Sequence, residues 1–230
     1  MRSSLRALTA AAVAASALLV PSASAEGPLI QPGAYSQSGN AGCTLNFVYD
    51  GVGDDRGRTF IGTAAHCVSK VGDDVLLSTR ETFGDVAWIG NEDATAPDVA
   101  LVEIRREFLS RVSPAVKGYP AYPTGVTTRQ DTVVGDLVQI SGYGMGFNST
   151  TLTRQSRVGV MNYDDDEIYD LVGPVIFGDS GGPIVHIESG KALGIVSRLC
   201  IGICTEEGPT VQGLLAQASA AGFNVALRTV

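Results

Sequence analysis

Short runs of apolar and β-branched residues, each bounded by turn-forming residues, recur along most of this chain. They cover residues 44–49, 59–64, 75–77, 83–89 and 99–104 in the first half, and 136–141, 152–161, 168–172, 183–187 and 192–199 in the second. Clusters rich in Gly and Asp, such as residues 51–57 and 72–74, separate them. Short strands at regular spacing between such turns are typical of β-barrels and sandwiches. The pattern therefore predicts an all-β fold, not alternating strands and helices.

A proline-rich segment separates the two sets of runs. Residues 113–125 contain Pro114, Pro120 and Pro123, and proline is excluded from central strands because it cannot donate to the ladder. We therefore expect a connector here, with one β subdomain on each side of it.

Near the C-terminus the spacing of apolar residues changes from that of a strand to that of a helix. Val211, Leu214, Leu215 and Ala218 fall on one face of a helix, and Gly222 can end it. We expect a short helix that packs this face against the rest of the protein.

The N-terminus reads as a secretory leader over residues 1–25. Arg2 and Arg6 precede an apolar run over residues 7–20, and a small-residue cleavage site follows at residues 23–25. The alternative is an uncleaved membrane anchor, but the apolar run is short and no stop-transfer pattern follows it. We expect the mature chain to be extracellular and free of the membrane, and residues 26–42 to be an N-terminal arm or a short propeptide.

Composition and charge narrow the choice of partners. The formal net charge is −8, and removal of Arg2 and Arg6 with the leader would lower it to −10. Only three lysines are present, and they are scattered. An acidic surface without a basic patch repels nucleic acid, so we expect no nucleic-acid partner.

Four cysteines follow the leader, and an even number in a secreted chain implies disulfides. They are Cys43, Cys67, Cys200 and Cys204, for which three pairings are possible. We favour two local loops, Cys43–Cys67 and Cys200–Cys204. A four-thiolate metal site is the competing interpretation, but the cysteines do not form two close knuckles, so we expect no metal there.

A serine among glycines carries the strongest chemical indication. Residues 178–183 read Gly-Asp-Ser-Gly-Gly-Pro. A tight turn of this kind can aim the N–H groups of Gly178 and Ser180 at one point, as an oxyanion hole requires. The alternative is an ordinary glycine-rich turn with Ser180 merely exposed, so the chain must also supply a base and an acid.

The chain has two histidines, and His66 is the better base. It ends an apolar run and adjoins Cys67, whereas His186 lies inside an alternating strand, where it faces out or packs against a neighbour. Asp98 opens the apolar run at 99–104 and is the expected third group, which orients the imidazole. Taken singly, His66 could be a structural histidine and Asp98 a strand-start residue.

Together these motifs resemble the chymotrypsin-like serine peptidases. The matching segments are Thr-Ala-Ala-His-Cys at 63–67, Asp-Val-Ala-Leu at 98–101 and Gly-Asp-Ser-Gly-Gly-Pro at 178–183. The order His, Asp, Ser is one of the chain orders in which this triad occurs. Residues 33–35 and 42–47 look most like the secreted bacterial streptogrisin-type branch, and the likeness extends from about Ala34 to the C-terminus.

The resemblance implies two six-stranded antiparallel β-barrels, over residues 43–112 and 126–230, with the active site between them and a short C-terminal helix on the second. It also implies that Ser180 is the nucleophile, His66 the general base and Asp98 its orienting acid, with an oxyanion hole at Gly178 and Ser180. Val196, Ser197 and Arg198 would bind the extended substrate by β-augmentation. The Cys43–Cys67 bridge matches one found in the family.

The chain departs from the family's pattern around Asp179, which precedes the nucleophile. The usual free N-terminal Ile or Val is missing, and residues 138–141 lack the arginine that bacterial relatives use. An unpaired buried carboxylate is costly, so we expect Arg154, Arg157 or the mature N-terminus to pair with Asp179.

The specificity pocket differs as well. Trypsin-like members carry an Asp six residues before the nucleophile, where this chain has Pro174, so cleavage after Lys or Arg is not expected. Arg198-Leu199 replaces the usual small residues at the pocket edge, and Val196 stands where glutamate-preferring relatives have a histidine. Either Leu199 partly fills the pocket and favours small apolar side chains at P1, the substrate residue before the scissile bond, or Arg198 attracts acidic ones. Of the two, we expect a preference for small or medium apolar residues.

The expected function is that of a secreted, monomeric serine endopeptidase acting on peptides or proteins without a cofactor. A catalytically weak binding protein on a protease fold is the alternative, favoured by the unusual Arg198-Leu199 edge and the missing Asp179 partner. An α/β-hydrolase esterase is excluded by chain order. The acidic run from Asp164 to Glu167 is a solvated loop by default, with a calcium site there left open.

Overall fold

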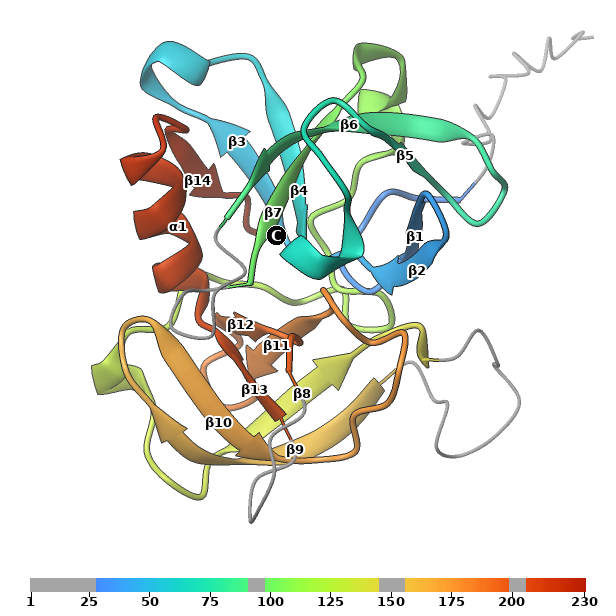
Figure 1. The fold of residues 1–230 in the computed structure, drawn as a ribbon. Coiled ribbons are helices and arrows are strands. Elements are labelled where there is room, and N and C mark those ends of the chain that lie inside the picture. Colours follow the sequence, from blue (N-terminus) through green and yellow to red (C-terminus); the bar gives the residue numbers. More distant parts are fainter. Residues whose placement is uncertain (1–27, 91–97, 145–155, 199–205) are drawn as a thin grey trace, which may run out of the picture.

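The computed structural model of this chain describes residues 28–90, 98–144, 156–198 and 206–230. Two antiparallel β-sheets make up most of it, one above the other in Figure 1, with one α-helix near the C-terminus. The prediction of an all-β fold with a short C-terminal helix is confirmed. None of the described helices is long and apolar enough to cross a membrane.

The first sheet has the strand order β14-β3-β4-β7-β6-β5-β1-β2. Its strands are β1 (Tyr35–Ser38), β2 (Ala41–Thr44), β3 (Val48–Gly51), β4 (Thr59–Thr63), β5 (Asp74–Leu76), β6 (Thr82–Ile89), β7 (Ala100–Ile104) and β14 (Val225–Leu227). Eight described strands therefore form this sheet, where six were expected, because β1 and β2 lie in and just beyond the expected arm and β14 joins from the C-terminus.

The second sheet has the order β12-β11-β8-β9-β10-β13. Its strands are β8 (Leu137–Ser141), β9 (Ser156–Asp164), β10 (Ile168–Val172), β11 (Pro183–His186), β12 (Ala192–Ile195) and β13 (Glu206–Pro209). In β10, Tyr169 and Leu171 point inward and are fully buried, so the alternation in the sequence matches one buried face.

Strand β13 was not predicted, because its sequence, Glu-Glu-Gly-Pro, has none of the apolar alternation that marks a strand. Its backbone pairs with β10, with Ile168 opposite Pro209 and Leu171 opposite Glu206. Backbone pairing with a strongly patterned neighbour therefore fixes a strand that side-chain pattern alone does not reveal.

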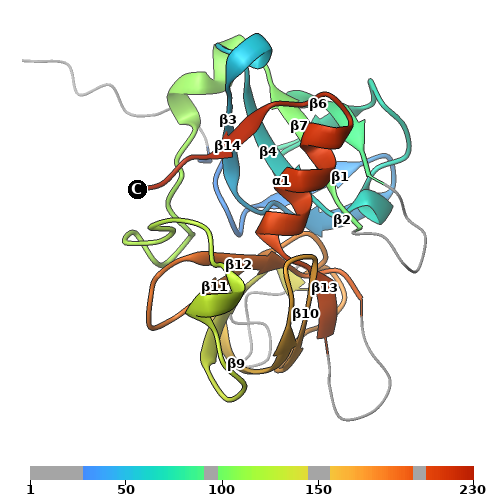
Figure 2. The same cartoon turned by 90° about the vertical axis from the view of Figure 1, so that its left-hand side faces the viewer.

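The helix α1 (Val211–Ala220) joins the two sheets. Its expected apolar face is confirmed, since Val211, Leu214 and Ala218 are fully buried. They belong to a core that also holds Phe60 of the first sheet and Ile195 of the second. Figure 2 shows α1 beside the first sheet, with its lower end above the second. Burial of this face from both sides fixes how the two sheets sit relative to each other.

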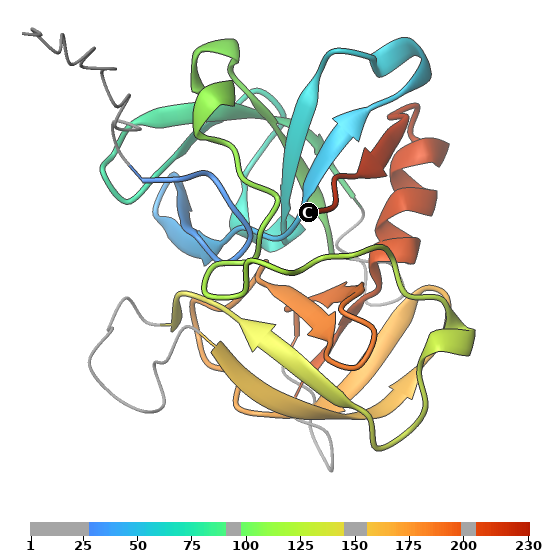
Figure 3. The ribbon, with the colours of Figure 1, turned by 180° about the vertical axis from the view of Figure 1, so that it is seen from behind.

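The chain crosses between the sheets twice. The connector 113–125 contains no strand, as its prolines predict, and Figure 3 shows it running along the junction of the sheets. At the C-terminus the chain returns to the first sheet, where Val225 of β14 pairs with Gly51 of β3. The expected domain boundaries at residues 43, 112 and 126 stay a prediction. The first sheet contains β14 from the C-terminal end of the chain, so it takes strands from both sides of these boundaries.

Candidate active site

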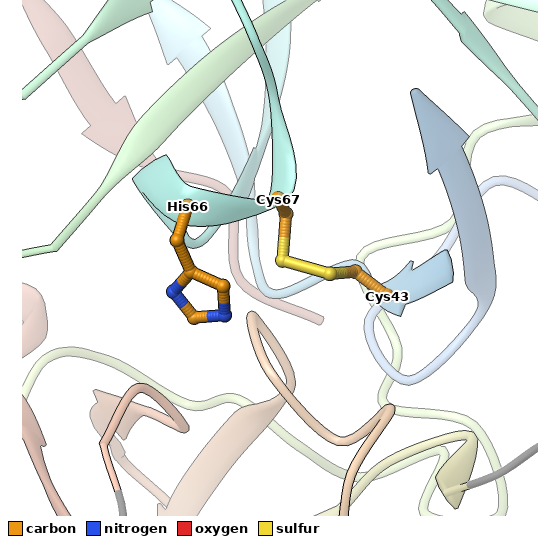
Figure 4. Close-up of side chains that lie close together, drawn as sticks. All are labelled: Cys43, His66 and Cys67. Carbon is orange, nitrogen blue, oxygen red and sulfur yellow. A yellow bond between two sulfur atoms is a disulfide. The ribbon is translucent and has the colours of Figure 1, made fainter. Parts of the chain in front are cut away.

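His66 lies in a short 3₁₀ turn (Ala65–Cys67) directly after strand β4. The turn lifts its side chain out of the sheet, so 44% of that side chain is exposed, while the flanking Ala65 and Cys67 are buried. Figure 4 shows the ring projecting from this turn beside the disulfide. The imidazole ring of His66 can therefore be reached from solvent, while the buried residues on either side hold its backbone in place.

The Cys43–Cys67 disulfide forms as predicted, with the two Cα atoms 6.1 Å apart. It joins strand β2, which contains Cys43, to the turn that carries His66. Cys200 and Cys204 lie outside the described residues, so their pairing stays a prediction.

Asp98 holds His66 from two directions. Its Oδ1 accepts a hydrogen bond from the His66 backbone N–H at 3.0 Å, and its Oδ2 lies 2.6 Å from the ring Nδ1. The carboxyl is only 5% exposed. Burial alone would raise the Asp98 pKa, but the hydrogen bonds from His66 and Ser197 outweigh it and lower that pKa to about 2. Asp98 is therefore ionised at neutral pH and favours the tautomer with a proton on Nδ1.

Ser197 is a residue of this site whose role the sequence did not reveal. Its hydroxyl donates to Oδ2 of Asp98 at 2.6 Å. The sequence assigned Val196, Ser197 and Arg198 to substrate binding only. A small hydroxyl side chain in a predicted strand gives no indication that it reaches an acid 99 residues away.

Ser180 lies in the predicted glycine-rich turn. The φ angles of Gly178 and Gly181 are +97° and +84°, in the region that favours glycine. A side chain at Gly181 would place its Cβ 2.3 Å from the carbonyl oxygen of Thr44. The glycines are therefore required both by the turn and by its close approach to strand β2.

Thr44 fixes the Ser180 turn from the opposite sheet. Its backbone N–H donates to the Ser180 carbonyl at 2.9 Å, and its hydroxyl donates to the Gly178 carbonyl at 2.7 Å. Thr44 follows the disulfide-bonded Cys43 directly. One short segment of the first sheet thus contacts both the serine turn and the histidine turn.

The partner of Asp179 is Arg157, one of the three that the sequence left open. Its Nη2 lies 2.6 Å from Asp179 Oδ1, and both side chains are almost fully buried. Arg157 is on β9, directly opposite Ile140 of β8. The cation therefore comes from the strand next to the one where relatives carry it. Arg154 lies outside the described residues.

Two backbone groups complete the environment of Asp179. The N–H of Gly144 donates to Oδ1 at 3.0 Å, and the N–H of Ile176 donates to Oδ2 at 2.9 Å. A Cβ at Gly142 would lie 2.2 Å from the same carboxylate. Asp179 thus anchors the segments on both sides of the serine turn, at a site with no room for a larger residue.

His66 and Ser180 line one cavity of about 290 Å³. Val175, Ile176 and Val196 give it apolar walls, and Phe177, Ser197 and Glu206 complete the lining. The cavity thus brings together the histidine of the first sheet, the serine of the second and the predicted binding segment. Pro174, where the sequence located the key specificity position, is exposed and does not line this cavity.

Glu206 is the second residue that the sequence did not place in the site. Its Oε1 accepts hydrogen bonds from the Ser197 N–H at 2.6 Å and from the Tyr169 hydroxyl at 3.2 Å. Burial raises the Glu206 pKa to about 8, although these donors act in the opposite direction. An uncharged carboxyl is therefore favoured at neutral pH in the empty cavity.

The remaining candidates lie away from this cavity. His186 is buried, with its Nδ1 2.8 Å from the Ser189 hydroxyl and its Nε2 3.2 Å from Asp136, so it packs against neighbouring residues, which is one of the two outcomes that the sequence left open. In the acidic run from Asp164 to Glu167, Asp165 accepts two backbone N–H groups and shapes a turn, and the calcium question stays open.

The fold is that of the chymotrypsin-like serine peptidases. The family model of the trypsin-like peptidase domain matches residues 47–195, and the chain belongs to that family. The streptogrisin-type branch stays an expectation within it. No curated protein sequence matches the chain.

Solved structures of bacterial proteases share the two-barrel fold. Protease A of Thermobifida fusca is 24% identical, with a TM-score of 0.59 over 88% of this chain and 100% of that one. The chymotrypsin of Cellulomonas bogoriensis is 20% identical, with a TM-score of 0.59 over 87% and 99%. A glutamic acid specific serine protease described as using a histidine triad in substrate binding is 20% identical, with a TM-score of 0.62 over 86% and 100%.

Proposed function

We propose that this protein is a secreted serine endopeptidase that cleaves peptide bonds through an acyl-enzyme formed on Ser180. The observation that carries the proposal is the double contact of Asp98 with the ring and backbone of His66, in a cavity that His66 shares with Ser180. A buried, ionised acid that holds an imidazole beside a serine is the arrangement that activates a hydroxyl nucleophile.

The residues act in sequence on the scissile carbonyl. The Ser180 oxygen attacks the carbonyl carbon while Nε2 of His66 takes the hydroxyl proton, and Asp98 stabilises the imidazolium through Nδ1. The carbonyl π electrons move to the oxygen to give a tetrahedral oxyanion. Its collapse breaks the C–N bond, and His66 donates the proton to the departing amine. Water then repeats the steps on the acyl-enzyme, with His66 again as base.

Gly178 and Ser180 are proposed as the oxyanion hole. Within the described parts of the chain, neither backbone N–H donates a hydrogen bond to another residue. The Thr44 contacts hold the carbonyls of the same two residues, which orients the turn. Donors that are held in advance stabilise developing charge without reorganising, and this is the source of their catalytic value.

Val196, Ser197 and Arg198 are proposed to bind the extended substrate. Both backbone groups of Arg198 pair with Glu207, and the Val196 N–H pairs with Gly182. Among the described residues the Ser197 carbonyl accepts no hydrogen bond from a neighbour. Ser197 is therefore the position in this segment whose carbonyl can accept from a substrate strand. The apolar walls of the cavity would contact the hydrocarbon part of the P1 side chain.

A fluorophosphonate probe tests the proposal, because it reacts only with an activated serine. The wild type should be labelled at pH 8 and should hydrolyse peptides, and Ser180→Ala should lose both properties. Ser219→Ala, which changes an exposed serine on α1, should retain them. Hydrolysis should fall as the pH drops through about 6.5, since a charged His66 cannot accept the proton.

A folded wild type that stays unlabelled and cleaves no peptide would contradict the proposal. Saturable peptide binding under those conditions would support the alternative, a binding protein on a protease fold. One of the two features that favoured this alternative is now explained, because Asp179 has its partner in Arg157.

A further inference from the structure

Glu206 brings a carboxyl to the cavity that contains Ser180. It is the only acidic residue among the cavity's lining residues that the structure describes, and it is 1% exposed. The walls near it are apolar side chains, including Val175 and Val196. A long side chain that occupies this cavity beside Ser180 would therefore have both apolar walls and the carboxyl of Glu206 around it.

One oxygen of this carboxyl lacks a partner. Oε1 accepts from Ser197 and Tyr169, and the backbone N–H of Arg198 also stabilises the charged carboxyl, whereas Oε2 is buried and makes no hydrogen bond of good geometry with any described residue. A buried polar atom without a partner is costly, so in a native fold it points to a missing ligand or a functional role.

Within the described residues Glu206 forms no ion pair with a cation, and the guanidinium of the adjacent Arg198 lies 4.0 Å from Glu207 instead. Tyr169 of β10 offers a hydroxyl, and Ser197 offers a backbone N–H. Asp179 repels the Glu206 charge, and the nearby Arg157 is paired with Asp179. A ligand cation would therefore be the group that supplies both the opposite charge and the missing donor.

We propose that Glu206 is a specificity-determining residue and that the cavity accepts a basic P1 side chain, lysine or arginine. The proposal rests on the proposed function, because it assigns the substrate class of the same site. The aliphatic stem of the side chain packs on the apolar walls, and its charged end donates to Oε2.

Other P1 residues fit this cavity less well. An acidic side chain would meet the Glu206 carboxyl and be repelled. An apolar one would fill the walls but leave Oε2 buried and without a partner, and sites built around a polar partner reject analogues that lack it. The expectation of an apolar P1 residue was based on Pro174 and on Arg198-Leu199. It did not take Glu206 into account, because strand β13 was not predicted from the sequence.

The pH dependence distinguishes a charge-based preference from a shape-based one. Only ionised Glu206 pairs with a cation, and burial raises its pKa to about 8 in the empty cavity. Tyr169, Ser197, Arg198 and Asp179 with its partner Arg157 are the groups near it, and His66 lines the same cavity. The preference for a basic P1 residue over an apolar one should therefore increase from pH 7 to pH 9, after His66 has already lost its proton.

The experiment compares 4-nitroanilide peptides that differ only at P1, which is Arg, Lys, Met, Leu or Glu. The wild type should cleave the Arg and Lys peptides at least about tenfold faster in kcat/KM than the Met peptide at pH 9, a ratio typical of a charge-assisted hydrogen bond. Glu206→Gln should lower kcat/KM for the Arg peptide about 10- to 100-fold and leave the Met peptide within about threefold. Glu107→Gln, the same change at an exposed site, should alter neither.

Two results separate this inference from the proposed function. An enzyme that is labelled and active, yet prefers apolar or acidic P1 residues at every pH, would overturn the inference alone. If the protein is neither labelled nor active, the proposed function fails, and the fluorescent cation p-aminobenzamidine then tests Glu206 by binding. Binding to the wild type that Glu206→Gln abolishes supports the role of Glu206, and equal or absent binding overturns it. Glu206→Asp provides a second variant if the Gln variant does not fold.

Discussion

Two buried carboxyl groups approach the active site from opposite sheets, and their pKa values move in opposite directions. Asp98, just before β7 in the first sheet, has a pKa of about 2, and Glu206, on β13 in the second, has a pKa of about 8. They are similarly inaccessible, at 5% and 1% exposed. Ser197 contacts both, since its hydroxyl donates to Asp98 and its N–H to Glu206.

The number and placement of donors explain the difference. Burial raises the pKa of both carboxyls. Asp98 receives donors on both oxygens, from His66 and Ser197, so its charged form is stabilised in the empty site. Glu206 receives its two well-formed hydrogen bonds on Oε1, the Arg198 backbone N–H adds a weaker contribution, and Oε2 has no well-formed partner among the described residues. The Asp98 carboxylate thus has its hydrogen-bond donors in the free protein, whereas we propose that Glu206 gains its remaining donor from the substrate.

Removal of the charge at Asp98 should produce the largest effect. Asp98→Asn keeps the size of the side chain but no longer favours the tautomer with a proton on Nδ1. We expect kcat to fall about 10⁴-fold, as such a change does elsewhere in triads of this kind. Steady-state kinetics on the best peptide substrate would measure it, with circular dichroism to show that the fold is retained. A loss below tenfold would mean that Asp98 does not orient the base.

Glu206 should affect stability in a way that depends on pH. Its folded-state pKa lies above the unfolded value of 4.5, so the folded state favours the protonated form. The free energy of unfolding therefore declines as pH rises from about 4.5 to 8. Glu206→Gln should remove this part of the decline, with an upper limit of about 5 kcal/mol at pH 8 and above, since each pKa unit corresponds to about 1.4 kcal/mol.

Urea unfolding of the wild type and of Glu206→Gln at pH 5 and pH 8 would measure this difference. The two proteins should differ more at pH 8, where the variant is the more stable. A difference that does not change between the two pH values would show that Glu206 ionises normally in the folded protein.

Ser197→Ala should produce the smallest effect, and it should change the surroundings of Asp98 but not those of Glu206. It removes the hydroxyl that donates to Asp98 but keeps the backbone N–H that donates to Glu206. Loss of one hydrogen bond to a charged group should raise the Asp98 pKa and reduce kcat/KM about tenfold. The ratio of basic to apolar P1 cleavage should stay the same, and a change in that ratio would show that Ser197 does not separate the two roles.

The sequence predicted the parts of this molecule that depend on local pattern. The buried alternation of β10, the apolar face of α1 and the Cys43–Cys67 bridge are all confirmed. His66, Asp98 and Ser180 were found because each lies in a short motif, and the structure brings His66 into contact with Asp98 and into a cavity with Ser180.

Contacts that depend on strand register could not be predicted in the same way. Arg157 reaches Asp179 because β9 pairs with β8 in one particular alignment, and the sequence could only name it among three possibilities. Glu206 lies in a strand without apolar alternation, so its position became visible only through the pairing of β13 with β10. Such residues reach the site only because their strand pairs with another strand in one particular register. They belong to no sequence motif, so the local sequence does not reveal their role.

The Cys43–Cys67 bridge lies between the turn that carries His66 and the segment that contacts the loop of Ser180. Cys67 directly follows His66, and Cys43 directly precedes Thr44, which donates hydrogen bonds to the carbonyls of Ser180 and Gly178. Disulfides persist in oxidising compartments and are rare in the cytosol. The redox state of the surroundings thus governs whether the turn that carries His66 is covalently tied to the strand that holds the loop of Ser180, so the relative placement of these two residues becomes coupled to the compartment in which the chain resides.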